Sequence, residues 1–398
     1  MVFFPLFAKG LRKNCYYSLC LALNFKYLRL RGNKRYIMEN RRTFIKKSGL
    51  FLAASALPFS SLYGFAPAKK LGVALLGLGG YATNQLAPAL QQTKNIELRG
   101  IITGSPDKIP RWKQKYGIKD ENIYNYENMD GIANNDDIDV IYVVVPTFLH
   151  SKYAVMAANT GKHVFCEKPM AMTAAECQDI IDACNKNKVK LAIGYRMQHE
   201  PNTKKIIKWA KTKPYGAIQT IDTKSGFRIG SSGGWRLDGA KGGGAIYDMG
   251  VYPLNAARYS AGLEPISVTA RHESKRPELF KNGANEITYF DLEFPENIKA
   301  DCMVTYNQGE GNLDINCADG SYELSPFQSY TGVSGTTSDG KVLSPCDCNQ
   351  QAIQMDDDAL SIINNKPMMV PGEEGQRDIR IVEAIFESAK NGSKRIQL

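Results

Sequence analysis

Between residues 71 and 193, short apolar runs of strand length alternate with longer stretches that suit helices. The apolar runs cover residues 71–76, 96–102, 140–145, 163–166 and 190–193. An unbroken apolar run is typical of a strand that is buried on both faces, as strands of parallel sheets are. Strands that alternate with helices predict an α/β fold built on a parallel, doubly wound sheet.

A glycine-rich turn follows the first of these strands directly. Residues 77–82 read Gly-Leu-Gly-Gly-Tyr-Ala, and a helix-compatible stretch then runs to about residue 92. Gly77 allows a tight turn, Gly79 lets the backbone approach a pyrophosphate, and Ala82 lets the helix pack closely on the strand. The helix N-terminus then faces the phosphates. This arrangement predicts a Rossmann dinucleotide-binding domain whose cofactor contacts include Gly77, Gly79, Gly80 and Tyr81.

The tip of the second strand indicates which dinucleotide is bound. An NAD-specific site usually places Asp or Glu there to hold the ribose 2′-hydroxyl. This chain reads Thr-Gly-Ser-Pro-Asp-Lys over residues 103–108. Hydroxyls with a nearby lysine suit a 2′-phosphate, so we expect NADP to be held by Thr103, Gly104, Ser105 and Lys108. The alternative is NAD, with Asp107 reaching back to the ribose and Lys108 solvated at the surface.

Three successive strands of this domain end in polar, potentially reactive groups. Pro146 and His150 follow residues 140–145, Glu167 and Lys168 follow residues 163–166, and Arg196 follows residues 190–193. The carboxyl ends of parallel strands meet at one edge of the sheet, where ligands bind. We expect these five residues to line the cofactor site, although a hydrogen-bonded loop histidine is an equal alternative for His150.

The N-terminal 68 residues differ in composition from the rest of the chain. They hold 12 Lys and Arg residues and one acidic residue, Glu39, whereas 38 basic and 39 acidic residues remain beyond them. The net charge of +10 therefore belongs to this leader. A nucleic-acid-binding protein needs a basic surface on its folded domains, and the sequence gives no sign of one.

Within the leader, residues 40–47 read Asn-Arg-Arg-Thr-Phe-Ile-Lys-Lys and resemble a twin-arginine export signal. A moderately apolar run over 49–65 and the sequence Ala-Pro-Ala at 66–68 follow, where a signal peptidase could cut. Because Met38 stands just before the arginine pair, we expect residues 1–37 to be an extension from a wrong start codon. We expect an exported protein without a membrane span after cleavage. The alternatives are a genuine longer leader and a basic anchor that is never cleaved.

The cysteines and histidines do not form a metal-binding pattern. Seven cysteines lie beyond the leader, an odd number, and the four histidines are scattered. Cys346 and Cys348 are two positions apart, which suits neither a zinc knuckle nor a redox C-x-x-C motif. We expect no metal site, and we interpret most of these cysteines as small buried hydrophobic residues.

Several further segments resemble the Gfo/Idh/MocA family of oxidoreductases and, within it, the glucose–fructose oxidoreductase group. The similarity extends over about residues 71–392. It rests on residues 124–126 (Tyr-Asn-Tyr), 161–170 (Gly-Lys-His-Val-Phe-Cys-Glu-Lys-Pro-Met), 193–196 (Ile-Gly-Tyr-Arg), 235–237 (Trp-Arg-Leu), 242–252 (three glycines, then Asp-Met-Gly-Val-Tyr) and 365–375.

This resemblance implies a second domain with a large, open, mostly antiparallel sheet and one helix at the active site. The domains we expect are the leader over 1–68, the Rossmann domain over 69–193 and an α+β substrate and oligomerisation domain over 194–398. Strand-like runs near 216–224, 265–271, 286–294, 299–306 and 311–317 agree with this. Because family members often associate through the open sheet face, a homodimer or homotetramer is implied. Residues 325–350, rich in Ser, Thr, Gly and Asp, are interpreted as a loop without a functional role.

We expect a catalytic group formed by Lys168, Asp248 and Tyr252. Asp248 and Tyr252 are four positions apart, so on a helix they share one face, and Lys168 stands at a strand tip. Oxidation of a sugar needs a base that takes the hydroxyl proton while the hydride leaves. Tyr252 could serve if the charge of Lys168 favours its phenolate, and Asp248 could orient the sugar or the base. The alternative is a half-buried core tyrosine beside an aspartate that only hydrogen-bonds its helix.

The resemblance implies roles for three more residues and indicates which group within the family the chain is most similar to. Arg196 would contact cofactor or substrate, with a salt bridge as the alternative. Trp235 and Arg236 would cover the cofactor, with loop packing as the alternative. Many family members carry His where this chain has Tyr252, whereas Tyr is typical of the glucose–fructose oxidoreductase group.

The sequence therefore predicts an exported, NADP-dependent sugar oxidoreductase that passes a hydride between a sugar and a tightly held cofactor. Only Lys69 and Lys70 separate the expected cut from the first strand, so the long N-terminal arm that covers the cofactor in the glucose–fructose oxidoreductase group is not expected. The alternatives are an exported, NAD-dependent glycosidase of the same superfamily and a non-catalytic sugar-binding protein. A binding protein has no need of the Lys168, Asp248 and Tyr252 group.

Overall fold

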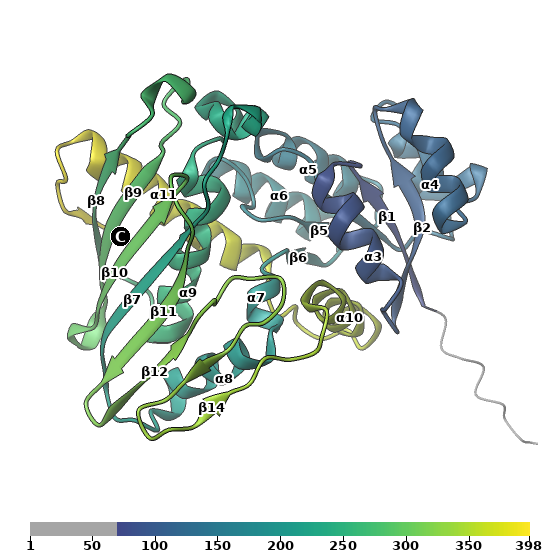
Figure 1. The fold of residues 1–398 in the computed structure, drawn as a ribbon. Helices are drawn as coiled ribbons and strands as arrows, with labels where there is room; N and C mark the ends of the chain where they lie inside the picture. The colour runs from purple at the N-terminus through teal and green to yellow at the C-terminus, as the bar shows by residue number, and fades with distance from the viewer. Residues whose placement is uncertain (1–69) are drawn as a thin grey trace, which may run out of the picture. The chain divides into compact units, whose positions relative to one another are not determined.

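The computed structural model of the chain describes residues 70–398 (Figure 1). The predicted export signal, its cleavage site and the suspected upstream extension lie outside the described residues, and they stay predictions. None of the helices within residues 70–398 combines the length and the apolar character needed to cross a membrane.

The first sheet has six parallel strands in the order β3-β2-β1-β4-β5-β6, which is the Rossmann order. Its strands are β1 (Leu71–Leu76), β2 (Ile96–Ile102), β3 (Ile123–Tyr124), β4 (Val140–Val143), β5 (His163–Cys166) and β6 (Leu191–Ile193). All five apolar runs that predicted strands therefore form strands of this sheet. The run over 140–145 forms β4, which ends at Val143, two residues earlier than predicted.

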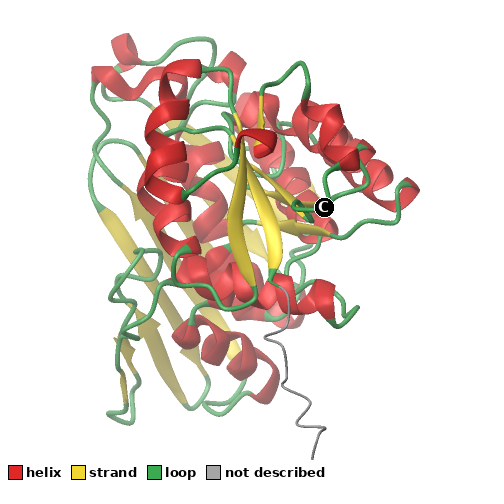
Figure 2. Cartoon of the chain, turned by 90° about the vertical axis from the view of Figure 1, so that its right-hand side faces the viewer, coloured by secondary structure: helices red, strands yellow, loops and turns green. Residues whose placement is uncertain are grey.

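Helices cover both faces of the first sheet (Figure 2). This is expected because its strands are apolar on both faces. Val73 and Leu75 of β1 point into one core cluster, whereas Ala74 and Leu76 point into another. The helices around this sheet are α3 (Ala87–Leu90), α4 (Ile109–Tyr116), α5 (His150–Asn159), α6 (Ala174–Lys186) and α10 (Gln350–Ile363).

Helix α10 belongs to the core of the first sheet although it comes late in the chain. Its Ala352, Met355 and Ala359 share a buried cluster with Val73 and Leu75 of β1. The boundary predicted at residue 193 therefore does not separate the two cores cleanly. An amphipathic pattern shows that a helix has an apolar face, but it does not show which sheet that face covers.

The second sheet has seven strands in the order β12-β11-β7-β10-β9-β8-β15. Its strands are β7 (Ile218–Gly226), β8 (Ser267–Glu273), β9 (Ile287–Glu293), β10 (Lys299–Thr305), β11 (Glu310–Cys317), β12 (Gly320–Leu324) and β15 (Ile396–Gln397). The β7–β10 pair is parallel and the other neighbouring pairs are antiparallel. This confirms the predicted large, mostly antiparallel sheet, and the parallel β7–β10 pair makes it mixed.

One face of the second sheet is packed and the other is open. Phe290 and Leu292 of β9 are buried, whereas Asp291 between them is exposed, as the two-residue period of a strand demands. The packed face contacts α9 (Val251–Ala261) and α11 (Gly372–Lys390), and α8 (Pro201–Thr212) packs on α9. Helix α9 carries one of the expected catalytic residues, so this packing fixes its position.

Candidate active site

The glycine-rich turn after β1 fits a dinucleotide. The amide of Gly77 donates to the carbonyl of Ile102 at 2.9 Å, and its φ of +100° suits glycine. A side chain at Gly77 would place its Cβ 2.4 Å from the carbonyl oxygen of Val144. Gly79 and Gly80, by contrast, are exposed and face open space, where a pyrophosphate can approach the backbone. The residues present therefore suit the predicted cofactor.

The tip of β2 turns toward this glycine-rich turn. The amide of Ser105 donates to the Thr103 hydroxyl at 3.0 Å, which orders the tip. The Lys108 ammonium donates to the carbonyl of Leu78 within the glycine-rich turn at 3.0 Å. Gly104 lies so close to the Tyr126 ring that an added Cβ would be 2.8 Å away. Lys108 is thus held beside the glycine-rich turn. It is not freely solvated, as the alternative supposed.

The turn after β4 holds His150 and Pro146, whose predicted contacts with the cofactor stay predictions. His150 is buried at the start of α5, and its two ring nitrogens lie 2.8 Å from the Pro169 carbonyl and 2.7 Å from the Val145 carbonyl. Burial lowers the pKa of His150. The ring lies between these two carbonyls, and the nitrogen that carries the proton donates to one of them, which agrees with the hydrogen-bonded alternative. Beside Pro146, the Thr147 hydroxyl is buried and has no hydrogen-bond partner among residues 70–398.

Glu167 supports the strand tip that carries Lys168. Its carboxylate accepts from the Tyr142 hydroxyl at 2.8 Å and from the Lys168 amide at 3.2 Å. A Cβ on Gly194 would stand 2.7 Å from that carboxylate, so glycine is needed beside it. Burial raises the pKa of Glu167. These contacts lock the backbone of Lys168, and a direct contact between Glu167 and the cofactor stays a prediction.

Lys168 brings the expected catalytic residues together. Its ammonium donates to the main-chain carbonyl of Asp248 at 2.6 Å and lies 3.7 Å from the Asp248 carboxylate. The same ammonium lies 4.5 Å from the centre of the Tyr252 ring. The active-site helix therefore faces the tip of β5, as the predicted constellation requires.

The local structure of this helix places Asp248 on the inside. Residues Ile246–Gly250 form a π-helical turn that leads into α9. Such turns occur frequently at functional sites, since they shift side chains relative to a regular helix. Asp248 and Tyr252 are both buried, and both reach the ammonium of Lys168.

The Asp248 carboxylate is held by two partners besides Lys168. One of its oxygens accepts from the Arg236 guanidinium at 2.8 Å and from the Tyr306 hydroxyl at 2.7 Å. Burial alone would raise the pKa of Asp248. The charges of Lys168 and Arg236, with the Tyr306 hydrogen bond, outweigh burial and hold that pKa below its ordinary value. Asp248 is therefore a fixed, ionised carboxylate.

Arg236 and Trp235 lie together, as expected, but Arg236 has a more specific contact than a cover over the cofactor. Its guanidinium carbon is 4.7 Å from the centre of the Trp235 ring while its Nε pairs with Asp248. Sequence reasoning missed Tyr306 entirely. It lies directly after β10, and the apolar run near 299–306 gave no sign that its hydroxyl turns inward.

Arg196 is a buried cation without an acidic partner. Its side chain is 2% exposed, and none of the ion pairs of residues 70–398 includes it. Its guanidinium donates to the main-chain carbonyls of Gln328 and Ser329 and to the Gln350 amide oxygen, while Nε has no partner within the described chain. The salt bridge weighed as an alternative is thus not seen.

The segment over residues 325–350, interpreted above as a loop without a role, contributes directly to the site. Tyr330 lies with its ring centre 4.5 Å from the Arg196 guanidinium carbon and 6.0 Å from the Tyr81 ring centre. Arg196 in turn lies 5.4 Å from the Tyr252 ring centre. These contacts were not predicted, because a loop without periodicity carries no sequence signal of which surface it meets.

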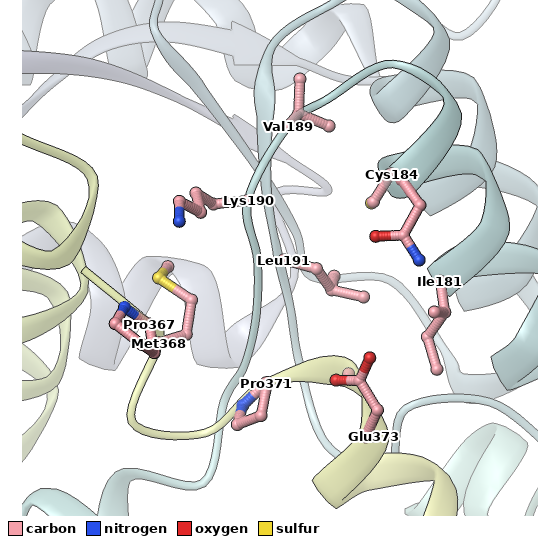
Figure 3. A pocket seen from close by; sticks show the side chains of 11 residues that line it. Ile181, Cys184, Val189, Lys190, Leu191, Pro367, Met368, Pro371 and Glu373 are labelled. Atoms are coloured by element: carbon pink, nitrogen blue, oxygen red, sulfur yellow. The ribbon is translucent and has the colours of Figure 1, made fainter. Parts of the chain in front are cut away.

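A separate cavity of about 210 Å³ lies elsewhere on the molecule (Figure 3). It is lined by the end of α6, the start of β6 and residues 367–373, with Ile181, Leu191 and Met368 among the apolar walls. It lies at the amino end of β6, whereas the site described above lies at the carboxyl ends of the strands. The described chain contains no group of three or more His, Cys, Asp or Glu residues that could hold a metal ion.

Comparison with known proteins agrees with this geometry. Residues 71–195 match the family model described as "Oxidoreductase family, NAD-binding Rossmann fold", and residues 203–323 match the GFO/IDH/MocA C-terminal domain. An aldose-aldose oxidoreductase from Caulobacter crescentus, crystallised with glycerol, is 36% identical with a TM-score of 0.79, covering 83% of this chain and 100% of that one.

Two more distant proteins extend the comparison. The NADP⁺-dependent D-xylose 1-dehydrogenase of Haloarcula marismortui is 26% identical over 331 residues, covering 80% of this chain and 91% of that protein. A 3-ketoreductase from Actinomadura kijaniata, solved with NADP and TDP-benzene, shares the fold at 20% identity and a TM-score of 0.69, covering 80% and 98% of the two chains.

The fold and the site define an NAD(P)-dependent oxidoreductase. The chain belongs to the Gfo/Idh/MocA family of oxidoreductases, as its motifs predicted.

Proposed function

We propose that this protein is an exported, NADP-dependent oxidoreductase that exchanges a hydride between a sugar hydroxyl or carbonyl and a retained nicotinamide cofactor, in the manner of the glucose–fructose oxidoreductase group. The observation that carries this proposal is the Lys168 ammonium, which contacts both Asp248 and Tyr252 at the carboxyl edge of the sheet. The similarity to an aldose-aldose oxidoreductase and to a xylose dehydrogenase supports sugars as the substrate class.

Three residues of the chain accept the proton, stabilise charge and orient the sugar. When bound, the nicotinamide ring supplies the acceptor for the hydride that leaves the sugar carbon. Tyr252, as a phenolate, takes the proton of the sugar hydroxyl at its Oη, and Lys168 stabilises the negative charge that this oxygen carries before the transfer. Asp248, fixed by Arg236 and Tyr306, orients the sugar hydroxyl beside Tyr252.

The preference for NADP rests on the tip of β2. Lys108 is held over the glycine-rich turn by the Leu78 carbonyl, and the tip itself carries hydroxyls instead of a carboxylate. Asp107 next to it is exposed. A lysine ammonium in this position favours a 2′-phosphate over a free 2′-hydroxyl.

Export has support from the cysteines. Cys346 and Cys348 form a disulfide, while the other five cysteines of the described chain are free and buried. Disulfides persist in oxidising compartments and are rare in the bacterial cytoplasm. The leader with its twin arginines supports the same location. The open face of the second sheet supports association into a dimer or tetramer.

Analysis of the purified protein tests the proposal. The chain from Lys69 onward would be purified, its bound nucleotide released and identified, and the loaded protein mixed with a panel of aldoses in a single turnover. We expect NADP(H) and a change in nicotinamide absorbance. Release of nitrophenol from aryl glycosides without any net change in absorbance would contradict the proposal and favour a glycosidase.

A further inference from the structure

Residues 327–330 reach from the second sheet to the dinucleotide-binding turn of the first. The amide of Phe327 donates to the carbonyl of Gly311 at 2.9 Å, and the Gln328 side chain donates to the carbonyl of Glu310 at 2.7 Å. This end of the segment is therefore fixed to β11. At the other end, the Tyr330 ring lies 6.0 Å from the ring of Tyr81, which directly follows Gly79 and Gly80.

Arg196 holds the segment in this position. Its guanidinium donates to the carbonyls of Gln328 and Ser329, and the Tyr330 ring lies over it at 4.5 Å. Gln350 at the start of α10 donates to the Ser329 carbonyl at 3.0 Å and accepts from Arg196. The segment is thus anchored to both domains through one buried cation.

The electrostatics of this cluster favour an anionic ligand. Arg196 is 2% exposed, its Nε has no hydrogen-bond partner within residues 70–398, and its partners are carbonyls, an amide and aromatic rings. The charge of Arg196 acts on the buried Glu167 carboxylate, but no ion pair of residues 70–398 includes Arg196, so an anion could add a direct partner to this buried cation. The phosphate-binding turn beside Tyr81 brings such an anion within reach of the cluster.

Tyr330 is the exposed member of the cluster. It is 41% exposed, an unusual state for a large aromatic side chain that stacks on a buried guanidinium. Its electrostatic neighbours include Tyr252 and Glu167 as well as Arg196. Its ring thus lies near Tyr81 of the glycine-rich turn and near Arg196, which in turn contacts the Tyr252 ring.

We propose that residues 327–330 are a clasp that retains the dinucleotide, with Tyr330 as the side chain that closes over it. This inference rests on the proposed NADP-dependent function. The clasp ties the second domain to the glycine-rich turn of the first. Release of the nucleotide requires the Tyr330 ring to leave Arg196 and Tyr81, which makes release slow.

The rate of nucleotide release tests the clasp without relying on catalysis. The protein from Lys69 onward is loaded with NADPH, and its fluorescence is followed after dilution into excess NADP⁺. Tyr330→Ala should accelerate release about two- to fivefold, which corresponds to the roughly 0.5–1 kcal/mol of a cation–π contact at a partly exposed site. Tyr330→Phe keeps the ring and should release NADPH at nearly the wild-type rate.

Two further variants make the result decisive. Gln328→Ala removes the side chain that fixes the segment to the Glu310 carbonyl and should also accelerate release. Val342→Ala, on the exposed β14 (Val342–Leu343) of the same loop region, should leave the release rate unchanged. Thermal unfolding of each variant separates loss of the clasp from loss of the fold.

Two outcomes would overturn the clasp, and a third would contradict the proposed function instead. Unchanged release from Tyr330→Ala overturns the clasp. A raised KM for the sugar with unchanged nucleotide release also overturns it, because Tyr330 would then face the substrate. A wild-type protein that binds no nicotinamide dinucleotide at all contradicts the proposed function, and this result is distinct from the first two.

Discussion

The ammonium of Lys168 lies 2.6 Å from the main-chain carbonyl oxygen of Asp248, closer than to the Asp248 carboxylate at 3.7 Å. The lysine is thus fastened to the helix backbone, while the carboxylate is fastened by Arg236 and Tyr306. Removing the Asp248 side-chain charge therefore leaves Lys168 in place, and the two residues can be tested separately.

We expect Lys168→Met to impair hydride transfer more than Asp248→Asn does. Lys168 is the cation nearest the Tyr252 ring, so its loss leaves the phenolate that accepts the sugar proton without its stabilising charge. The single-turnover rate of cofactor reduction by an aldose should fall by about 10²-fold or more in Lys168→Met. Both variants should still bind NADP. A greater loss in Asp248→Asn would show that the carboxylate, and not the lysine, supports the proton acceptor.

Arg236→Gln should change the pH dependence of catalysis. Asp248 has a lowered pKa partly because Arg236 pairs with it, so loss of that cation raises the pKa of Asp248. Protonation of Asp248 would then begin at higher pH as the solution is acidified. We expect the acid limb of the kcat/KM profile to move to higher pH relative to the wild-type protein. A profile that does not move would mean that Asp248 need not be ionised.

Lys108→Ala should weaken NADP binding but not NAD binding. The Lys108 ammonium is held beside the glycine-rich turn, where it can donate a charged hydrogen bond to the 2′-phosphate. Loss of such a bond costs about 1–3 kcal/mol. Titration calorimetry with each dinucleotide measures the effect, and equal wild-type affinities for NAD and NADP would refute the preference.

Asp358→Asn should stabilise the protein at pH 8 but not at pH 4. Asp358 is fully buried in α10, neither carboxylate oxygen has a partner within the described residues, and burial raises its pKa to about 6. A raised folded-state pKa means that stability is lost as pH rises from about 4, near the unfolded pKa, to about 6. Thermal unfolding at both pH values tests this. Equal effects at pH 4 and pH 8 would show that charge burial is not the cause.

The parts of the fold that local pattern determines were predictable. The glycine-rich turn between β1 and its helix could be recognised because strand, turn and helix are adjacent in the chain. The strand-like runs near 265–271 and 286–294 also became β8 and β9, since a buried strand keeps its apolar residues wherever it lies. The edge strand β15 (Ile396–Gln397) was missed, because two residues carry no detectable period.

The parts of the site that depend on distant segments could not be predicted in the same way. Tyr306 reaches Asp248, Tyr330 reaches Tyr81, and helix α10 reaches the core of the first sheet through tertiary packing alone. Cys346 and Cys348 form a disulfide despite a spacing that matched no familiar motif. The pairing of Arg236 with Asp248 likewise joins residues whose separation of 12 positions has no helical or strand period.

The substitution Tyr252→Phe tests the central claim most directly. It keeps the ring beside Lys168 and Arg196, so the fold and cofactor binding should survive, and only the hydroxyl is lost. If that hydroxyl accepts the sugar proton, single-turnover reduction of bound NADP⁺ by aldoses should fall by about 10²–10⁴-fold, the usual contribution of general acid–base catalysis. A Phe variant that reduces its cofactor at the wild-type rate would contradict the account and return Tyr252 to the role of a core aromatic residue.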